Sequence, residues 1–192
     1  TAGNLATVEI YEQDVTWDGI DVVRNAADNR GDETGLETQG ITVRAYGVDV
    51  RNVNIDTDLG SETDNNNYGV FVSDEGAPTG KVNLSGVKAT GFETGVLVND
   101  YYEGSIEGVE MTRVTTPDHH ENGLSVQEVN DGISDGGVTG SNNDFTGGVE
   151  GSGASIVTND AAAVSLDGPI QVEDGDVSRR AVAEGERAHV RA

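Results

Sequence analysis

Gly69-Val70-Phe71-Val72 and Gly95-Val96-Leu97-Val98 are two copies of one short pattern: a glycine, an apolar residue, any residue and a second apolar residue. The pattern recurs along most of the chain, and its last copy is weaker. The other copies are Gly19-Ile20-Asp21-Val22, Gly40-Ile41-Thr42-Val43, Gly123-Leu124-Ser125-Val126 and Gly153-Ala154-Ser155-Ile156. Successive glycines lie 21, 29, 26, 28 and 30 residues apart. Periods in this range are typical of solenoids and propellers.

The content of each repeat favours a solenoid built from strands. Apolar residues alternate with period two, and no segment shows a sustained helical stripe. A second β-prone stretch lies between copies, at 48–55, 80–87, 105–111 and 163–166. Residues that tolerate tight turns fill the gaps, as in 64–67 and 141–144. Propeller blades would need roughly 40–50 residues and four antiparallel strands each, and a sandwich would not repeat glycine at its strand starts. Stacked parallel coils, about 4.8 Å apart, fit this pattern.

This stacking predicts two inward ladders and one outward row. The first ladder holds Ile20, Ile41, Val70, Val96 and Leu124, and the second holds Val22, Val43, Val72, Val98, Val126 and Ile156. The outward row is Asp21, Thr42, Phe71, Leu97, Ser125 and Ser155. Phe71 and Leu97 are therefore expected side by side on the outer surface. An exposed apolar pair of this kind marks a contact surface, which is a subunit interface, the floor under a long loop or a sugar-stacking platform.

Charge is the strongest compositional signal. The 192 residues carry 35 acidic and 11 basic side chains, a net charge of −24, and only two basic residues are Lys. Such a surface repels nucleic acid and anionic lipid. The chain has no Cys, which excludes disulfides and thiolate chemistry, and no apolar run approaches the roughly 20 residues that span a bilayer. Acidic chains with few aromatics are often disordered, but the apolar residues are placed too regularly for that here.

The repeats resemble those of the right-handed parallel β-helices of the pectate-lyase-like superfamily. The resemblance covers roughly residues 15–170, and the acidic, Lys-poor composition is similar to β-helix proteins of halophilic archaea or their viruses. It implies an all-β, right-handed parallel β-helix of about five to seven coils. We expect a β-helix domain at 1–170 and a C-terminal cap or docking segment at 171–192. The superfamily contains lyases, hydrolases and virus tailspikes, so the fold does not assign an activity.

Enzyme motifs of that superfamily are mostly missing. Asp-Asp, Gly-His-Gly and Arg-x-Lys segments do not occur. Registering the repeats by their glycines instead places Asp74, Asp100 and Glu128 on successive coils, about 5 Å apart. Like charges that close favour a bridging cation, and calcium takes oxygen ligands of this kind. A solvated acidic rim is the alternative, which we prefer on a chain of this charge. If the chain is an enzyme, the same three residues are its catalytic candidates.

Three other segments carry polar or aromatic side chains of interest. Tyr101 and Tyr102 either form the rim of a carbohydrate groove or pack over the coil edge. The segment 117–122 contains His119 and His120 beside carboxylates, but adjacent histidines on a loop need not converge on a metal, so we interpret it as a hydrophilic insert. The C-terminal segment concentrates four Arg in its last fourteen residues. It caps the last coil, docks on a neighbouring subunit or leads into a further domain.

Two functions fit these features. The first is a salt-adapted structural or adhesive module of a cell surface or virus spike, with other surface proteins, a receptor or further copies of itself as partners. The second is a polysaccharide lyase or glycoside hydrolase that uses the column Asp74–Asp100–Glu128. We prefer the first, because no complete catalytic set is present. Both imply an extracellular, cell-surface or virion location, with no required cofactor and no nucleic-acid partner.

Overall fold

The computed structural model describes residues 5–24, 38–57, 67–73, 79–100, 106–128, 137–146, 148, 152–157, 164–167 and 189–190. Within these residues the secondary structure consists of strands, with no helix, and every strand pairing is parallel. The predicted all-β parallel solenoid is therefore confirmed. The strands are β1 (Leu5–Ile10), β2 (Thr16–Asp18), β3 (Val22–Arg24), β4 (Thr38–Val43), β5 (Val48–Thr57), β6 (Asn67–Ser73), β7 (Thr79–Thr90), β8 (Thr94–Asp100), β9 (Ile106–Thr112), β10 (Asn122–Glu128), β11 (Val138–Ser141), β12 (Ser152–Val157), β13 (Val164–Asp167) and β14 (His189–Val190).

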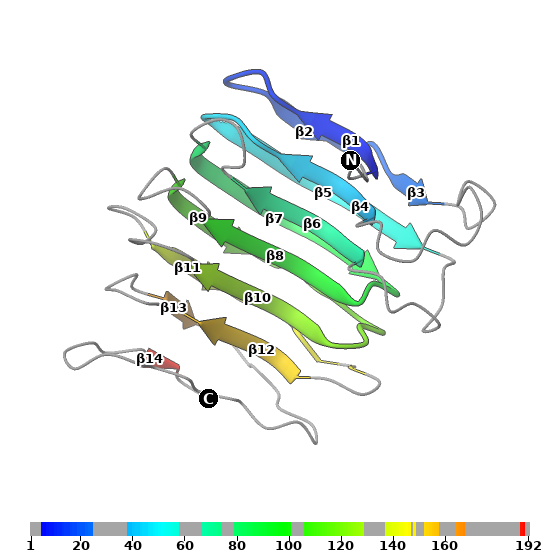
Figure 1. Ribbon diagram of the computed structural model, residues 1–192, viewed down its shortest axis with the longest axis vertical. Coiled ribbons are helices and arrows are strands. Elements are labelled where there is room, and N and C mark those ends of the chain that lie inside the picture. Colours follow the sequence, from blue (N-terminus) through cyan, green and yellow to red (C-terminus); the bar gives the residue numbers. More distant parts are fainter. Residues whose placement is uncertain are drawn as a thin grey trace.

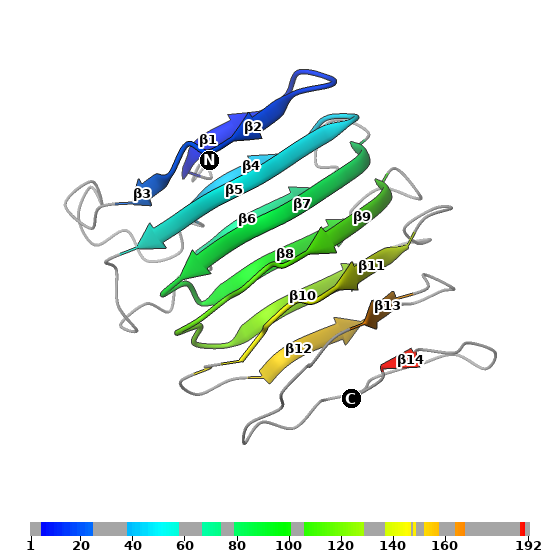
Figure 2. The same cartoon turned by 180° about the vertical axis from the view of Figure 1, so that it is seen from behind.

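The strands form two sheets that face each other across the core. Sheet A has six strands in the order β1-β4-β6-β8-β10-β12. Sheet B has eight, in the order β14-β13-β11-β9-β7-β5-β2, with β3 also paired to β5. The chain alternates between the sheets as it advances, and β1 and β14 lie at opposite ends of the stack (Figure 1). The reverse view shows sheet B in front (Figure 2).

The aliphatic ladders of sheet A follow the predicted register. Ile41, Val70, Val96 and Leu124 are successive partners, and Ala154 continues their row. The second row contains Val43, Val72, Val98, Val126 and Ile156. The eight side chains from Ile41 to Leu124 and from Val43 to Val126 are fully buried. Identical strand spacing and β-branched side chains let each coil cover the apolar face of the next.

The first copy of the pattern does not belong to these ladders, which corrects the sequence prediction. Ile20 is 55% exposed, and Val22 pairs with Ile55 of sheet B. Asp21 is likewise absent from the outward row. β1 takes this place in sheet A: Val8 is opposite Ile41, and Ile10 is opposite Val43. The segment Gly19-Ile20-Asp21-Val22 matches the same sequence pattern as the other copies. Only the other copies, however, lie near the start of a strand of sheet A.

The repeated glycines are required because there is no space for a side chain. A Cβ on Gly40, Gly69, Gly95 or Gly123 would lie 2.6, 2.6, 2.8 and 2.7 Å from the carbonyl oxygen of the next glycine in the column. Each would also overlap a core-facing side chain from outside sheet A, such as Ile55 of β5 or Phe145. Carbon and oxygen atoms do not approach this closely without a bond between them. The glycine column is therefore a place where successive coils of sheet A leave no room for a side chain.

A second column turns the chain within sheet B. Gly19, Asn52, Gly86, Arg113 and Asn142 have φ values of 69, 50, 63, 54 and 55°. In every coil this residue comes directly after a member of one row of register partners across sheet B. The row consists of Asp18, Arg51, Ser85, Thr112 and Ser141. A left-handed residue in every coil bends the chain at the same place, which Gly and Asn accept at low cost. The bend directs Val53, Val87 and Val114 into the core as a further buried row.

Sheet B includes the second β-prone stretch of each repeat. β5, β7, β9 and β13 cover the predicted segments, and Val48, Val82, Val109, Val138 and Val164 align across them. The sequence analysis did not identify β11, a four-residue strand whose signal is the short run Val138-Thr139-Gly140. β14 pairs with β13, so sheet B reaches beyond residue 170. Residues 171–188, for which a cap or docking role was predicted, lie outside the described part of the chain.

Candidate functional surfaces

The outer side of sheet A carries the predicted aromatic and aliphatic pair. Phe71 and Leu97 are register partners, as expected, but they are 1% and 3% exposed, so the prediction that they are exposed was wrong. Thr42 and Ser125 in the same row are also buried, and the Tyr68 ring centroid lies 5.4 Å from that of Phe71. This burial arises within one chain. The chain itself therefore covers the outer side of sheet A, which favours a floor under covering residues over a subunit interface or a sugar-stacking platform.

A row of polar side chains continues from this covered face toward the C-terminal ends of the strands. Ser73, Asn99 and Gln127 are register partners, and Ser73 and Asn99 are buried. The Asn99 side-chain amide donates to Gln127 Oε1 over 3.5 Å, and the Gln127 amide donates to Ser125 Oγ over 3.3 Å. These are long bonds between neutral groups. The row holds neighbouring strands in register and offers no charged group for chemistry.

The next position brings two of the three predicted acidic residues together. Asp100 of β8 and Glu128 of β10 are direct register partners. Asp74 lies outside the described residues, and for Asp100 and Glu128 only the backbone is described. Adjoining strands are about 4.8 Å apart, so these two residues lie opposite each other on neighbouring coils. Among the described residues, no group of three His, Cys, Asp or Glu side chains is arranged to hold a metal ion.

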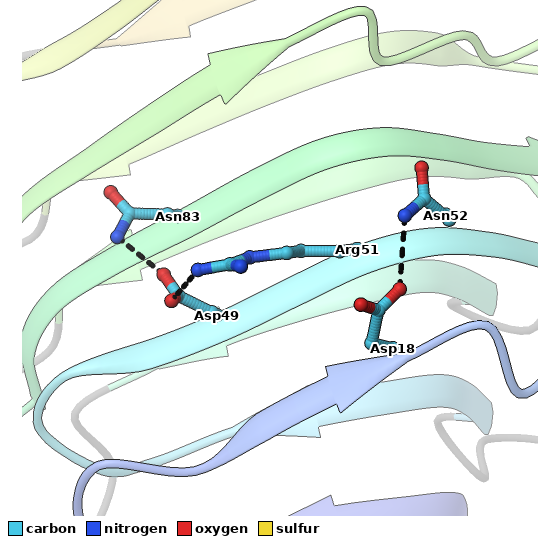
Figure 3. A network of polar contacts seen from close by, with 5 residues as sticks. All are labelled: Asp18, Asp49, Arg51, Asn52 and Asn83. Atoms are coloured by element: carbon cyan, nitrogen blue, oxygen red, sulfur yellow. Dashed lines mark hydrogen bonds and ion pairs between the residues drawn. The ribbon is translucent and has the colours of Figure 1, made fainter.

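Acidic side chains of sheet B and its bends contact amides of the next coil (Figure 3). The Asn52 amide donates to Asp18 Oδ1 at 2.9 Å, and the Asn83 amide donates to Asp49 Oδ1 at 2.6 Å. Arg51 forms an ion pair with the same Asp49. The five residues come from β2, β5 and β7; the contacts Asp18–Asn52 and Asp49–Asn83 cross between neighbouring strands, whereas Arg51 lies along its own strand towards Asp49 (Figure 3). The carboxylates therefore connect one coil to the next.

Asp21 makes the same kind of contact at the bend after β2. Its Oδ1 accepts from the backbone amide of Asn54 at 2.8 Å and from the Asn54 side chain at 3.1 Å. The backbone amide, followed by the side-chain amide, holds the pKa of the Asp21 carboxyl below its usual value of 3.8. A carboxylate that stays ionised and accepts hydrogen bonds from two neutral donors has a structural role. It does not have that of a general acid or base.

The segment 117–122, expected to be a hydrophilic insert, is partly buried. His119 is 1% exposed, and its Nδ1 lies 2.6 Å from the carbonyl oxygen of Thr116. A carbonyl can only accept, so Nδ1 carries a proton. The backbone amide of His120 donates to the carbonyl of Phe92 at 3.1 Å, which fixes the segment against the preceding coil. Because His119 is enclosed, it cannot present its ring to a substrate, and its role is to pack this bend.

Asn143 is a buried polar residue that the sequence analysis did not single out. It is 4% exposed. On the next coil it occupies the position opposite Val114, in the row of inward residues after the bend. Its Oδ1 accepts from the backbone amide of Val114 at 2.8 Å, and its side-chain amide donates to the carbonyl of Met111 at 3.2 Å. One side chain thus satisfies two backbone groups that would otherwise be buried without partners. The Asn-rich run 141–144 was the available signal, although it indicated only a turn.

The remaining predicted contact residues, Tyr101 and Tyr102, lie outside the described part of the chain. Comparisons with protein-family models, with curated proteins and with solved structures found no match. In the described residues, no helix has the length and apolar character needed to cross a membrane. The fold and the contacts above define the class of this protein, which is a parallel β-solenoid in which several polar side chains join successive coils.

Proposed function

We propose that this chain is a salt-adapted structural module of a cell surface or virus spike, with an adhesive or receptor-contacting role outside the cell. The observation that supports this most directly is the use of its acids. Asp18, Asp21 and Asp49 all accept hydrogen bonds from amides of an adjoining coil. Catalytic acids need a perturbed pKa and a free path to substrate. Carboxylates that join one coil to the next by hydrogen bonds are consistent with a structural module.

A finer description of the fold belongs to the same proposal. We propose right-handed winding of the solenoid and a relationship to the pectate-lyase-like superfamily. The six-stranded sheet A and the alternation of the chain between two parallel sheets support this description. Parallel strands joined by crossovers are almost always wound right-handedly. The superfamily assignment rests on the Gly-Φ-x-Val repeats and on the Asn-rich turns of the sequence.

Salt adaptation is tested by measuring stability against salt concentration. At a net charge of −24 the folded chain repels itself in dilute buffer. Raising the salt from about 0.1 M to about 1 M shortens the Debye length from ~10 Å to ~3 Å. The melting temperature should therefore rise steeply over this range, in KCl as in NaCl. A melting temperature that stays constant or falls contradicts a fold built for high salt.

The polysaccharide-active enzyme is the second candidate, and one observation favours it: Asp100 and Glu128 are register partners on adjoining strands. Hydrolases use two carboxyls about 5–5.5 Å or 6.5–9.5 Å apart, and stacked coils allow the shorter spacing. The test is to incubate the protein in molar salt with a panel of polysaccharides and to measure reducing ends and unsaturated products. The structural proposal predicts no turnover. Turnover that is lost in Asp100→Asn and Glu128→Gln, but retained in the exposed control Asp144→Asn, establishes the enzyme instead.

The acidic column of Asp74, Asp100 and Glu128 can be tested separately, and we propose that it is a solvated rim in preference to a calcium site. Bridging by Ca²⁺ would offset the repulsion between carboxylates on successive coils. For a solvated rim, calorimetric titration with CaCl₂ in molar NaCl should give no saturable heat; saturable heat for the wild type that is absent in Asp100→Asn would establish the calcium site. If the wild type gives no heat and no change in melting temperature, the acidic column is a solvated rim.

A further inference from the structure

One asparagine of sheet B lies in a sequence pattern that glycosyltransferases recognise. Asn83-Leu84-Ser85 matches Asn-x-Ser/Thr with a central residue other than Pro, which is the acceptor pattern for N-linked glycans. The chain has 15 Asn, and no other one is followed by Ser or Thr two positions later. The pattern is short, so its meaning depends on where the fold places it.

Both polar residues of this pattern lie on the outer side of sheet B. Along β7, Val82 and Leu84 are buried in the core. Asn83 and Ser85, which alternate with them, are partly exposed. Residues two apart in a strand lie on the same face, so the Ser85 hydroxyl is on the same side of the sheet as the Asn83 amide. The pattern also ends at the bend of the coil, because Gly86, with a φ of 63°, follows directly.

The surface around Asn83 is open to solvent. The Lys81 side chain, two residues earlier on β7, is 61% exposed. Glu110, the register partner of Asn83 on β9, has a side chain that is 52% exposed. The outer side of sheet A is different, because the chain itself covers Phe71 and Leu97 there. The outer side of sheet B at Asn83 can therefore carry a bulky hydrophilic group.

The hydrogen bond that Asn83 makes leaves its amide available for attachment. Nδ2 carries two hydrogens, and one of them is donated to Asp49 Oδ1 at 2.6 Å (Figure 3). A glycan replaces one hydrogen and leaves the other, so a glycosylated Asn83 can still bond to the preceding coil. Asn52 and Asn54 also donate to acids of the preceding coil, but neither has Ser or Thr two positions later. The contact between coils therefore explains the amide and not the hydroxyl at Ser85.

We propose that Asn83 is the attachment site of an N-linked glycan. The donor is an oligosaccharide joined to a lipid through phosphate. Asn83 Nδ2 forms a bond to C1 of the first sugar while the bond from C1 to the phosphate oxygen breaks. The lipid phosphate leaves with the electron pair, and the amide loses one proton. Transfer precedes the pairing of β7 with β5 and β9, since a strand held between two others cannot enter the transferase.

This inference rests on the proposed function, because N-linked glycans belong to secreted proteins. It also makes that function more specific. A glycan is bulky and solubilising, so at Asn83 it keeps the outer sides of β5, β7 and β9 from packing against another protein. An adhesive or receptor-contacting surface of this module then lies elsewhere on the solenoid.

Tryptic digestion of the native protein, purified from its own cells, provides a direct test. Cleavage after Lys81 and Lys88 releases the peptide 82–88, in which Asn83 is the only Asn. Mass spectrometry should find this peptide with the added mass of a glycan, and fragmentation should locate that mass on Asn83. The peptide 52–81 is the internal control, because it contains five Asn outside the acceptor pattern and should be unmodified.

Variants expressed in the same cells separate glycan attachment from folding. Ser85→Ala keeps the Asn83 amide and its bond to Asp49 but should lose the glycan, as should Asn83→Gln, whereas Ser85→Thr should retain it. A native protein that is outside the cell with an unmodified peptide 82–88 overturns the glycan and leaves the proposed function standing. A native protein inside the cell with this peptide unmodified overturns both. A glycan located on Ser85, or one retained by Ser85→Ala, overturns the assignment to Asn83.

Discussion

Replacing Gly95 by Ala tests why glycine recurs once in each repeat. A Cβ at this position would lie 2.8 Å from the carbonyl oxygen of Gly123 and would overlap the side chain of Thr116. Ordinary contacts between nonbonded heavy atoms are about 3.5–4.0 Å, so the neighbouring coil would have to move by roughly 0.7 Å or more. Extra methyl groups in a packed core cost about 1–3 kcal/mol, and occasionally more. Because one of the two obstacles is backbone, we expect a loss of about 3 kcal/mol or more.

The free energy of unfolding, measured by urea denaturation in molar salt, is the appropriate readout. Gly19→Ala is the matched control, since its Cβ would meet nothing within 4 Å but its φ is +69°. A left-handed alanine costs roughly 1–2 kcal/mol, so the control should lose less than Gly95→Ala. If Gly95→Ala is as stable as the wild type, or if Gly19→Ala loses more, then close packing between coils is not the reason for the repeated glycine.

Three further predictions follow from the buried and polar contacts. Phe71→Ala should lose about 3–5 kcal/mol of stability without a change in the mass of the protein in solution, measured by denaturation and by light scattering, because the ring is 1% exposed within a single chain; a changed mass with unchanged stability would instead indicate a subunit interface. Asn143→Ala should lose about 2–4 kcal/mol, since it leaves the Val114 amide and the Met111 carbonyl without their partner, whereas Asn83→Ala, at a more exposed contact, should lose less than about 1 kcal/mol. The stabilising effect of Asp21 should be present above pH 3.8 and be lost as the pH falls through its lowered folded pKa, because protonation weakens the carboxylate as the acceptor of the two Asn54 donors. In a series of melting curves at different pH, Asp21→Asn should remove this part of the acid transition. An identical acid transition in the variant would exclude the contact.

Most of sheet A could be predicted because its signal is local and repeated. A period-two pattern and a glycine at each strand start identify which residues face inward, and the register of Val43, Val72, Val98 and Val126 follows from aligning the copies. The same alignment failed at its first copy. The 21-residue spacing between Gly19 and Gly40 was shorter than the others and was the available warning. The strand that precedes Ile41 in sheet A starts at Leu5 and contains no glycine.

The candidate site was predicted less well, because exposure depends on residues far away in the sequence. The outward row from Thr42 to Ser125 was correctly aligned, yet the chain covers it, which no alternation within a strand can reveal. His119 was expected in a hydrophilic insert and is enclosed for the same reason. In contrast, the pairing of Asp100 with Glu128 needed only the strand period, and it was predicted correctly.

The sequence by itself determined the repeat, the strand register of sheet A and the excess of negative charge, since each of these depends on residue type and spacing along the chain. The tertiary structure alone decided which glycines lie where two coils almost touch, which outward side chains are covered and which acids receive amides from the next coil. Those properties are set by contacts between residues far apart in the sequence, 26 to 30 positions along the glycine column and 34 for the Asp–Asn contacts, where the geometry of the stack determines what each side chain meets.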